Sequence, residues 1–260
     1  MPTYEDIPYV ADANPRHTLD IYAPDTDTAS LPLVIFIHGG SWRTGDKSEC
    51  RVLAHGLVSQ SQGPAVAVIN YRLSQCTPDS IRHPTHLQDA TKAVQFLVHN
   101  NDYPARHLID TNNVYLIGHS AGAHLASLMV LGDQLDCIAS IRGVLGVGGI
   151  YDIPDLLELY PDYSDFIDMA FDPAQYQEAS PQHVAKCRRA VAEHIRFMIV
   201  NSAGDSLIAP ALAANFASQL ISSGYTNVEL VVRDLGSHFG MLDNKEFWRL
   251  ATNFVREITN

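Results

Sequence analysis

The stretch Asn113-Val114-Tyr115-Leu116-Ile117-Gly118-His119-Ser120-Ala121-Gly122 decides the fold of this chain. Its β-branched, aromatic and aliphatic residues, Val114 to Ile117, are typical of a buried strand, whereas the small and apolar residues from Ala121 to Met129 are typical of a helix. Ser120 therefore falls at the turn between the two elements. The glycines on either side let strand and helix approach closely, so the Ser120 hydroxyl is expected to point out above the sheet, where a nucleophile belongs.

Length and composition indicate one α/β domain over residues 1–260. The chain is 46% hydrophobic, which is enough to bury a large core. It carries 29 acidic and 17 basic residues, for a net charge of −12. This balance offers no basic surface for nucleic acid and repels anionic membranes, so neither is expected as a partner.

Cysteine usage and the N-terminus indicate a cytoplasmic protein. The four cysteines are scattered and form no C-x-x-C pair, so we expect reduced thiols and no zinc site; they are Cys50, Cys76, Cys137 and Cys187. No apolar run approaches the length of a membrane span, and the first residues lack the basic start of a leader. His83 and His86 flank Pro84, which disfavours a helical ligand pair, so we expect neither a metal nor another cofactor.

Strand-like runs alternate with helical patterns, which predicts a mostly parallel central sheet with helices on both faces. The predicted strands are Leu19–Ala23, Leu33–Ile37, Ala65–Asn70, Asn113–Ile117, Gly143–Val147, Phe197–Asn201 and Val228–Asp234. The predicted helices include Thr85–Asn100, Ala209–Ser223 and Glu246–Thr259.

One segment, residues 150–189, interrupts this alternation and is expected to form a small cap insertion. It is longer than an ordinary loop of an α/β sheet and rich in Asp, Tyr, Phe and Pro. Its aromatic residues are candidates either to line a pocket over Ser120 or to pack the cap against the body; they are Tyr151, Tyr160, Tyr163, Phe166, Phe171 and Tyr176.

A serine nucleophile needs a base to take its proton and an acid to orient that base. His238 follows the strand Val228–Asp234 in a glycine-flanked loop, and we favour it over His183 and His194 as the base. Asp205 follows the preceding strand, 33 residues before His238, and is the favoured acid. Asp152 is the alternative acid, and either aspartate would also suit a helix N-cap.

Backbone N–H groups beside Ser120 are candidates to stabilise an oxyanion. Gly39 and Gly40 follow the strand Leu33–Ile37 and allow the backbone to approach a ligand oxygen. Ala121 follows the candidate nucleophile at the start of a helix and would supply the second donor.

These motifs together resemble the α/β-hydrolase superfamily, and within it the hormone-sensitive-lipase-like esterases that include kynurenine formamidases and small carboxylesterases. The resemblance runs from about His17 to the C-terminus and rests on His38-Gly39-Gly40-Ser41-Trp42 with Gly45-Asp46-Lys47, on Asn70-Tyr71-Arg72-Leu73, and on Gly118-His119-Ser120-Ala121-Gly122. It implies an α/β-hydrolase fold and a catalytic triad of Ser120, Asp205 and His238. It also implies an oxyanion hole formed by Gly39, Gly40 and Ala121.

The expected function is cleavage of small carboxylic esters through an acyl-enzyme, with arylformamidase activity as the close alternative. A non-catalytic receptor or a lyase on the same fold is a remote alternative. For the substrate pocket we expect Trp42, His119, Tyr151 and Phe239. The expected partner is a small ester or formamide; the oligomeric state stays open, with a homodimer as one alternative.

Overall fold

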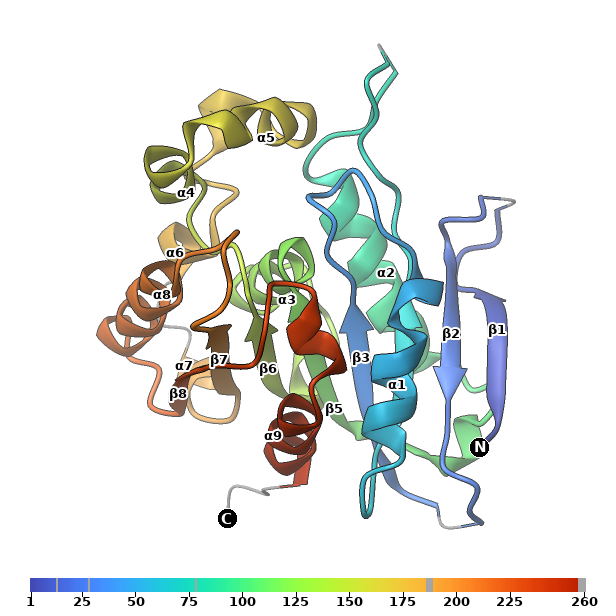
Figure 1. Ribbon diagram of the computed structural model, residues 1–260. Helices are drawn as coiled ribbons and strands as arrows, with labels where there is room; N and C mark the ends of the chain where they lie inside the picture. Colours follow the sequence, from blue (N-terminus) through green and yellow to red (C-terminus); the bar gives the residue numbers. More distant parts are fainter. Residues whose placement is uncertain (13, 28, 78, 186–188, 257–260) are drawn as a thin grey trace.

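The strands of the protein form one mixed sheet. In the computed structural model, which describes residues 1–12, 14–27, 29–77, 79–185 and 189–256, the strands are β1 (Thr3–Pro8), β2 (Thr18–Tyr22), β3 (Leu31–Ile37), β4 (Ala65–Ile69), β5 (Ile109–His119), β6 (Ile141–Val147), β7 (Arg196–Ser202) and β8 (Val228–Arg233). Their order across the sheet is β1-β2-β4-β3-β5-β6-β7-β8 (Figure 1). Strands β3 to β8 are parallel, and β2 pairs antiparallel with both β1 and β4. The prediction of a mostly parallel sheet is confirmed.

Helices connect the strands and cover both faces of the sheet (Figure 1). They are α1 (Arg51–Val58), α2 (Thr85–His99), α3 (Ala121–Leu131), α4 (Ile153–Leu159), α5 (Ser164–Ala170), α6 (Pro181–Val184), α7 (Arg189–Ala192), α8 (Pro210–Ser222) and α9 (Lys245–Arg256). The predicted helices correspond to α2, α8 and α9, although residues 257–259 of the last prediction lie outside the described residues. Among the helices described, none has the length and apolar character that a membrane crossing requires.

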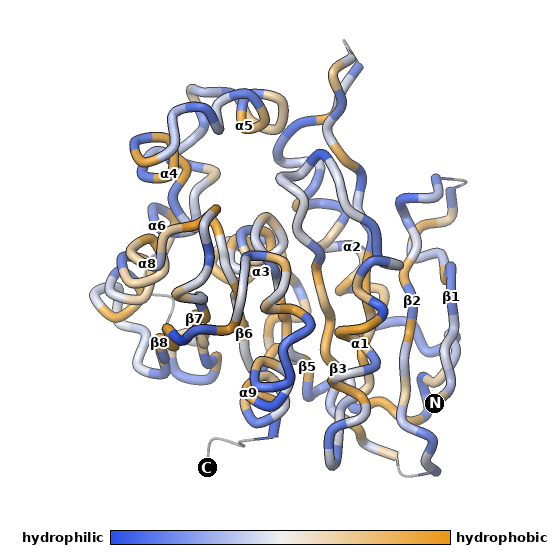
Figure 2. Tube along the Cα trace, viewed as in Figure 1, coloured by the Kyte–Doolittle hydropathy of each residue, from blue (hydrophilic) through white to orange (hydrophobic). Residues whose placement is uncertain are grey.

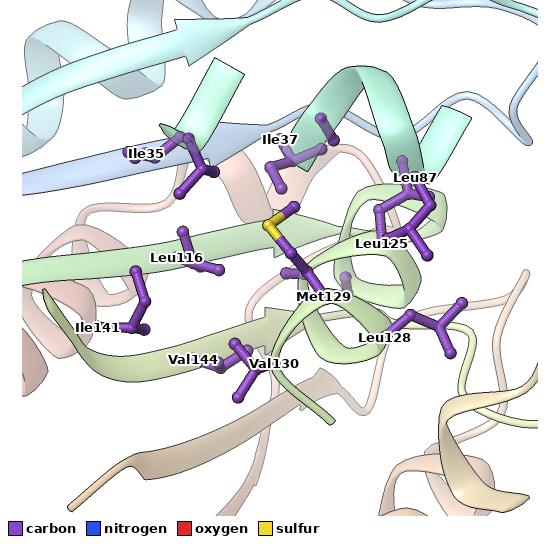
Figure 3. Close-up of a cluster of buried hydrophobic side chains, with 14 of the residues drawn as sticks. Ile35, Ile37, Leu87, Leu116, Leu125, Leu128, Met129, Val130, Ile141 and Val144 are labelled. Atoms are coloured by element: carbon purple, nitrogen blue, oxygen red, sulfur yellow. The ribbon is translucent and has the colours of Figure 1, made fainter. Parts of the chain in front are cut away.

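The two faces of the sheet build two cores because side chains along a strand alternate between faces. On β3, Leu33, Ile35 and Ile37 pack into the core with α2 and α3, whereas Val34 and Phe36 pack into the core with α1 and α9. Figure 3 shows part of the first core, where side chains of the sheet meet those of α2 and α3. Figure 2 shows the corresponding apolar residues along β3, in contrast to the hydrophilic edge strand β1.

Helix α3 is buried along its whole length, unlike the amphipathic helices that surround it. All its residues from Ala121 to Leu131 are buried. Gly122 makes this position attainable, since a β-carbon there would lie 2.0 Å from the carbonyl oxygen of Ile37. Glycine at this point lets the start of α3 lie directly against the end of β3.

The interval predicted as a cap contains short helices that lie beyond the carboxyl ends of the strands. Helices α4, α5 and α6 fall within residues 150–189, with 3-10 turns at Pro161–Tyr163 and Pro173–Gln175. Figure 1 shows α4 and α5 above the end of the sheet to which β3, β5 and β7 point. Residues 186–188 of the predicted cap, including Cys187, lie outside the described residues.

Candidate active site

Ser120 stands at the sharp turn between β5 and α3, as its sequence context predicts. Its backbone has φ 52° and ψ −117°, a conformation that L-residues other than glycine rarely adopt. The turn is held by the Ser120 N–H, which donates to the Val147 carbonyl on β6 at 3.0 Å. The residue is buried, with 6% of its surface exposed. The fold thus keeps a strained serine at the carboxyl end of a central strand.

The loop after β3 lies against Ser120. A β-carbon on Gly39 would be 3.0 Å from Ser120 Cβ and 2.8 Å from His119 Nδ1, so a side chain at this position would crowd the turn at Ser120. Gly40 follows with φ +106°. On the other side of Ser120, Ala121 is the first residue of α3, and its N–H has no acceptor within the helix. The structure therefore places the loop that carries Gly39 and Gly40 on one side of Ser120 and the start of α3, with Ala121, on the other.

His238 and Asp205 meet in a buried hydrogen bond. His238 Nδ1 lies 2.8 Å from Asp205 Oδ2, and both side chains are almost fully buried. The other carboxylate oxygen of Asp205 accepts from the N–H groups of Leu207 at 2.9 Å and Ile208 at 3.0 Å. Burial acts to raise the pKa of Asp205, but these hydrogen bonds outweigh burial and hold that pKa below its ordinary value. Asp205 is therefore a fixed carboxylate that accepts from His238.

The alternative acid, Asp152, lies in a different environment. One of its oxygens accepts from the N–H of Asp155 at 3.1 Å and so caps α4. The other lies 2.9 Å from His183 Nε2 and 2.9 Å from Gln182 Nε2. Asp152 thus serves the helix-capping role considered for it from the sequence, and the structure pairs it with His183 rather than with His238.

Gly148 lies between the acid and base loops. Its φ is +54°, and a β-carbon there would lie 3.2 Å from Asp205 Oδ2 and 3.2 Å from both His238 Nδ1 and Cε1. The end of β6 therefore passes directly beside the Asp205–His238 pair. Gly148 was not among the residues predicted from the sequence, and its position after a buried strand was the available signal.

Ser202 joins the loop that carries Asp205 to the loop that carries His238. Its hydroxyl donates to the Gly236 carbonyl at 2.6 Å and accepts from the N–H groups of Leu235 at 2.9 Å and Gly204 at 3.1 Å. Ser202 was also not among the residues predicted from the sequence. Its signal was a polar side chain at the carboxyl end of β7, after the apolar run Phe197–Val200 and three residues before Asp205.

His119, the residue before Ser120, connects the Ser120 turn to the loop that carries His238. Its Nε2 lies 2.9 Å from the backbone oxygen of His238, and since a carbonyl oxygen only accepts, Nε2 carries the proton. The two imidazole rings are 4.6 Å apart. Burial, and to a smaller extent the neighbouring His238, lowers the pKa of His119 to about 3. His119 is thus a neutral donor that positions the backbone of His238; its predicted role in the pocket stays a prediction.

His38 and Tyr71 support the loop after β3. The Tyr71 hydroxyl donates to the His38 carbonyl at 3.0 Å, and the two rings are stacked with centroids 4.5 Å apart. His38 Nδ1 lies 2.7 Å from the Gly39 oxygen, and burial lowers the His38 pKa to about 4. This neutral histidine fixes the peptide orientation immediately before Gly40.

The other predicted pocket residues occupy contrasting positions. Trp42 is fully buried and packs against Phe171 at 4.7 Å between ring centroids. Tyr151 is 1% exposed and stacks on Phe216 at 4.2 Å. Phe239, in contrast, is 62% exposed, with its ring 5.1 Å from that of His238. Phe239 therefore lies at the open side of the candidate site, whereas Trp42 and Tyr151 are buried in the hydrophobic core.

The histidines of the segment His83-Pro84-Thr85-His86 lie apart from any grouping of metal ligands. The His86 ring is fully buried, with Nε2 3.0 Å from the Ser74 hydroxyl, and burial lowers its pKa to about 3. Within the described part of the chain, the one grouping of possible ligands is His99, Asp136 and Cys137, beside the C-terminal end of α2. These residues are not among those that contact Ser120 or His238.

Comparison with known proteins identifies the family. The BD-FAE family model matches residues 19–220, which is well over half of the chain. The chain belongs to the BD-FAE family. The matched BD-FAE segment begins in β2 and ends in α8, so it contains Ser120 and Asp205 but stops before His238. The resemblance to the esterase and kynurenine formamidase-like branch of the α/β-hydrolases is confirmed.

Individual relatives match part of the chain. Kynurenine formamidase of Danio rerio is 31% identical over 143 residues, or 54% of this chain and 44% of that protein. A probable isoprenylcysteine alpha-carbonyl methylesterase of Oryza sativa subsp. japonica is 35% identical over 118 residues, or 45% of this chain and 25% of that protein. The chain thus spans less than half the length of these curated relatives.

The similarity to solved structures extends over nearly the whole chain. The crystal structure of esterase B from Lactobacillus rhamnosis (HN001) aligns with a TM-score of 0.79 at 24% identity, covering 98% of this chain and 84% of that one. At this level of identity the likeness concerns the fold, and it confirms the predicted α/β-hydrolase fold.

Proposed function

We propose that the protein is a serine hydrolase that cleaves small carboxylic esters through an acyl-enzyme on Ser120. The observation that carries the proposal is the buried hydrogen bond of 2.8 Å between His238 and Asp205, because the His238 backbone in turn contacts His119, next to the strained Ser120. A hydrogen-bonded acid and base at the carboxyl ends of β7 and β8, with a serine at the carboxyl end of β5, provides the three groups that acyl transfer requires.

The reaction proceeds in two halves. His238 Nε2 takes the proton of the Ser120 hydroxyl as the serine oxygen attacks the ester carbonyl carbon. The resulting oxyanion is stabilised by N–H groups of Gly39, Gly40 and Ala121, and its collapse expels the alcohol, to which His238 returns the proton. Water then attacks the acyl-enzyme by the same route, which releases the carboxylic acid and restores Ser120.

Asp205 determines which nitrogen of His238 is free. A carboxylate only accepts, so Nδ1 of His238 carries a proton toward Asp205 and Nε2 is left as the base. When Nε2 gains the serine proton, the carboxylate stabilises the imidazolium that forms. The two backbone bonds to Asp205 and the bond from His119 to the His238 backbone fix the pair before substrate arrives.

Arylformamidase activity is the second candidate. The observation that favours it is the sequence similarity to kynurenine formamidase of Danio rerio over 54% of this chain. Hydrolysis of a formamide passes through the same kind of tetrahedral oxyanion as hydrolysis of an ester, so the same groups serve both reactions. The two candidates differ in the leaving group, an aryl amine instead of an alcohol.

The test compares wild-type protein with Ser120→Ala on p-nitrophenyl acetate and N-formylkynurenine. Ser127→Ala is the matched control, because Ser127 lies on the same helix, is fully buried, and has no hydrogen-bond partner for its hydroxyl in the described structure. We expect Ser120→Ala to keep the fold and lose nearly all turnover, and Ser127→Ala to keep its activity. Equal activity in Ser120→Ala and wild type would refute the proposal.

The ratio of kcat/KM for the two substrates separates the candidates. Ester turnover with negligible deformylation supports the carboxylesterase. A preference for the formamide by orders of magnitude supports the arylformamidase instead. Inactivity of the wild type on both substrates would favour a receptor or a lyase on this fold.

A further inference from the structure

A recess lined by three arginines lies beside the loop that carries Gly39 and Gly40. Its volume is about 320 Å³, and its charged lining residues are Arg16, Arg43, Arg72 and Asp79. The chain as a whole has 29 acidic and 17 basic residues, so three guanidinium groups around one recess run against the overall charge. Guanidinium groups bind carboxylates and similar planar anions through paired N–H donors.

Two of these arginines, Arg72 and Arg16, already form ion pairs with carboxylates of the protein. Arg72 donates to both oxygens of the buried Asp89 at 2.7 and 2.8 Å. Arg16 donates to the Gly45 carbonyl at 2.8 Å and lies 3.3 Å from Asp46. These bonds hold the two side chains in place and leave part of each guanidinium fork unused, since each fork carries five N–H donors.

Arg43 is the arginine of the recess whose charge is not matched. Within the described residues it forms no ion pair with a carboxylate, and Asp79 is not within ion-pair distance of any of the three arginines. Its guanidinium instead lies 5.3 Å from the centre of the Phe166 ring on α5. A cation over an aromatic face is oriented by that ring while it keeps its N–H donors available at its edge.

The position of Arg43 relative to Gly40 is fixed by a tight turn. Its N–H donates to the Gly40 carbonyl at 3.0 Å, which closes a turn over Ser41 and Trp42, both of which have positive φ. The two ends of such a turn lie within about 7 Å of each other. Since Gly39 lies against Ser120, Arg43 begins one turn away from the groups proposed to bind the oxyanion.

Aromatic side chains connect this arginine to the other side of the site. Phe166 packs against Tyr163 at 5.1 Å, and the Tyr163 hydroxyl donates to the Leu207 carbonyl at 3.0 Å, two residues after Asp205. Phe166 lies on α5, which Figure 1 shows beyond the carboxyl ends of the strands, and Tyr163 ends the 3-10 turn Pro161–Tyr163 that precedes it. Phe166 and Tyr163 thus link Arg43, in the loop that carries Gly40, to Leu207, in the loop that carries Asp205.

We propose that Arg43, with the recess it lines, binds a carboxylate on the substrate, remote from the bond that is cleaved. This inference rests on the proposed serine hydrolase and specifies its substrate class: an aryl ester or aryl formamide that carries an anionic group. Arg16 and Arg72 contribute their remaining N–H donors, and Asp79 acts against the binding of the anion.

The test uses two esters that differ only in charge, 3-(4-acetoxyphenyl)propanoate and 3-(4-acetoxyphenyl)propanamide. Two methylene groups separate the charge from the phenol, so the two acetyl groups have matched reactivity. We expect wild type to favour the anion by about tenfold in kcat/KM, which corresponds to one charge-assisted hydrogen bond, and Arg43→Gln to bring the ratio close to one. Arg43→Lys should restore part of the preference, and Asp79→Asn should increase it.

The matched control is Arg142→Gln, which makes the same change in net charge. Arg142 is exposed at the start of β6, at the opposite end of the strand from the site. This variant should keep the wild-type ratio. A wild-type ratio of one or less, or a ratio that Arg43→Gln leaves unchanged, would overturn the inference.

The experiments distinguish an error in the proposed anion binding at the recess from an error in the proposed hydrolase function. Turnover of p-nitrophenyl acetate that Ser120→Ala abolishes supports the hydrolase whatever the charge preference is. If no turnover depends on Ser120, the proposed function fails, and calorimetry of 3-(4-hydroxyphenyl)propanoate with wild type and Arg43→Gln then decides the recess. Equal binding by the two proteins would overturn the inference.

Discussion

Replacing Asp205 with asparagine tests the proposed acid and base most sharply, because the surrounding hydrogen bonds dictate how the amide must lie. One oxygen of Asp205 accepts from the N–H groups of Leu207 and Ile208 at 2.9 and 3.0 Å. The amide oxygen of the variant must keep this place, since an NH₂ group there would face two donors. The NH₂ group is then 2.8 Å from His238 Nδ1, where the second carboxylate oxygen was.

The expected loss of activity follows from that orientation. An NH₂ group facing Nδ1 requires an unprotonated Nδ1, so the proton of neutral His238 moves to Nε2, which then cannot accept from Ser120. We expect kcat to fall by about 10⁴-fold, which is about 5 kcal/mol in the activation barrier. Both backbone hydrogen bonds persist, so the free energy of unfolding should stay within about 2 kcal/mol of wild type.

The assay is hydrolysis of p-nitrophenyl acetate, with urea unfolding of each variant alongside. Asp152→Asn is the matched control, because asparagine is an equally good N-cap and preserves the bond to the Asp155 N–H. This control should keep kcat close to that of wild type. A loss of less than tenfold in Asp205→Asn, or a larger loss in Asp152→Asn, would refute the assignment of the acid.

Other substitutions and acid titration test the surroundings of the site. In Gly39→Ala the new methyl group would meet His119 Nδ1 at 2.8 Å and Ser120 Cβ at 3.0 Å, so we expect kcat to fall by about 10²-fold, and unchanged kcat would contradict the placement of this loop. Ser202→Ala leaves two N–H groups without their acceptor and should lower the free energy of unfolding by roughly 1–3 kcal/mol in urea titration; no loss would show that the link between the loops is unimportant. Burial lowers the folded pKa of His86, His119 and His124 to about 3, so the folded state binds fewer protons than the unfolded state, in which histidine titrates near 6.5. Stability should therefore be complete above about pH 6.5 and fall as the pH drops from there toward 3, by up to about 1.4 kcal/mol per pH unit for each histidine; a free energy of unfolding that stays constant from pH 7.5 to 5 would contradict this.

The central strands were predictable because their apolar runs are set by burial on both faces. Strands β3 to β7 all coincide with predicted runs, with extensions at their ends, such as the start of β5 at Ile109. Strand β1 was missed, since Thr3–Pro8 mixes exposed and half-buried residues and lacks an apolar run. Its pairing with β2, which shifts register between Tyr4 and Ile7, is decided by tertiary contact rather than by local sequence.

The residues of the candidate site also differ in how far the sequence could predict them. Ser120 and its flanking glycines are a local motif, and the chain order of strand ends pointed to Asp205 and His238. The role of Ser202 could not be predicted, because its partners Leu235 and Gly236 are 33 and 34 residues away in sequence. The burial of the predicted pocket residues could not be predicted from the sequence either, since it depends on how the segment after β6 folds back over the sheet.

The order of strands across the sheet gives the three proposed catalytic groups different mechanical support. Ser120 extends from β5, near the middle of the sheet, onto the fully buried α3. His238 follows β8, which is the edge strand of the sheet formed by the described residues, beside β7, and has exposed Leu230 and Val232. Amide hydrogens at the Ser120 turn should therefore exchange only on global unfolding, and those of the His238 loop through smaller local openings. Mild denaturant would then abolish activity by displacing the base from a serine that is still in place.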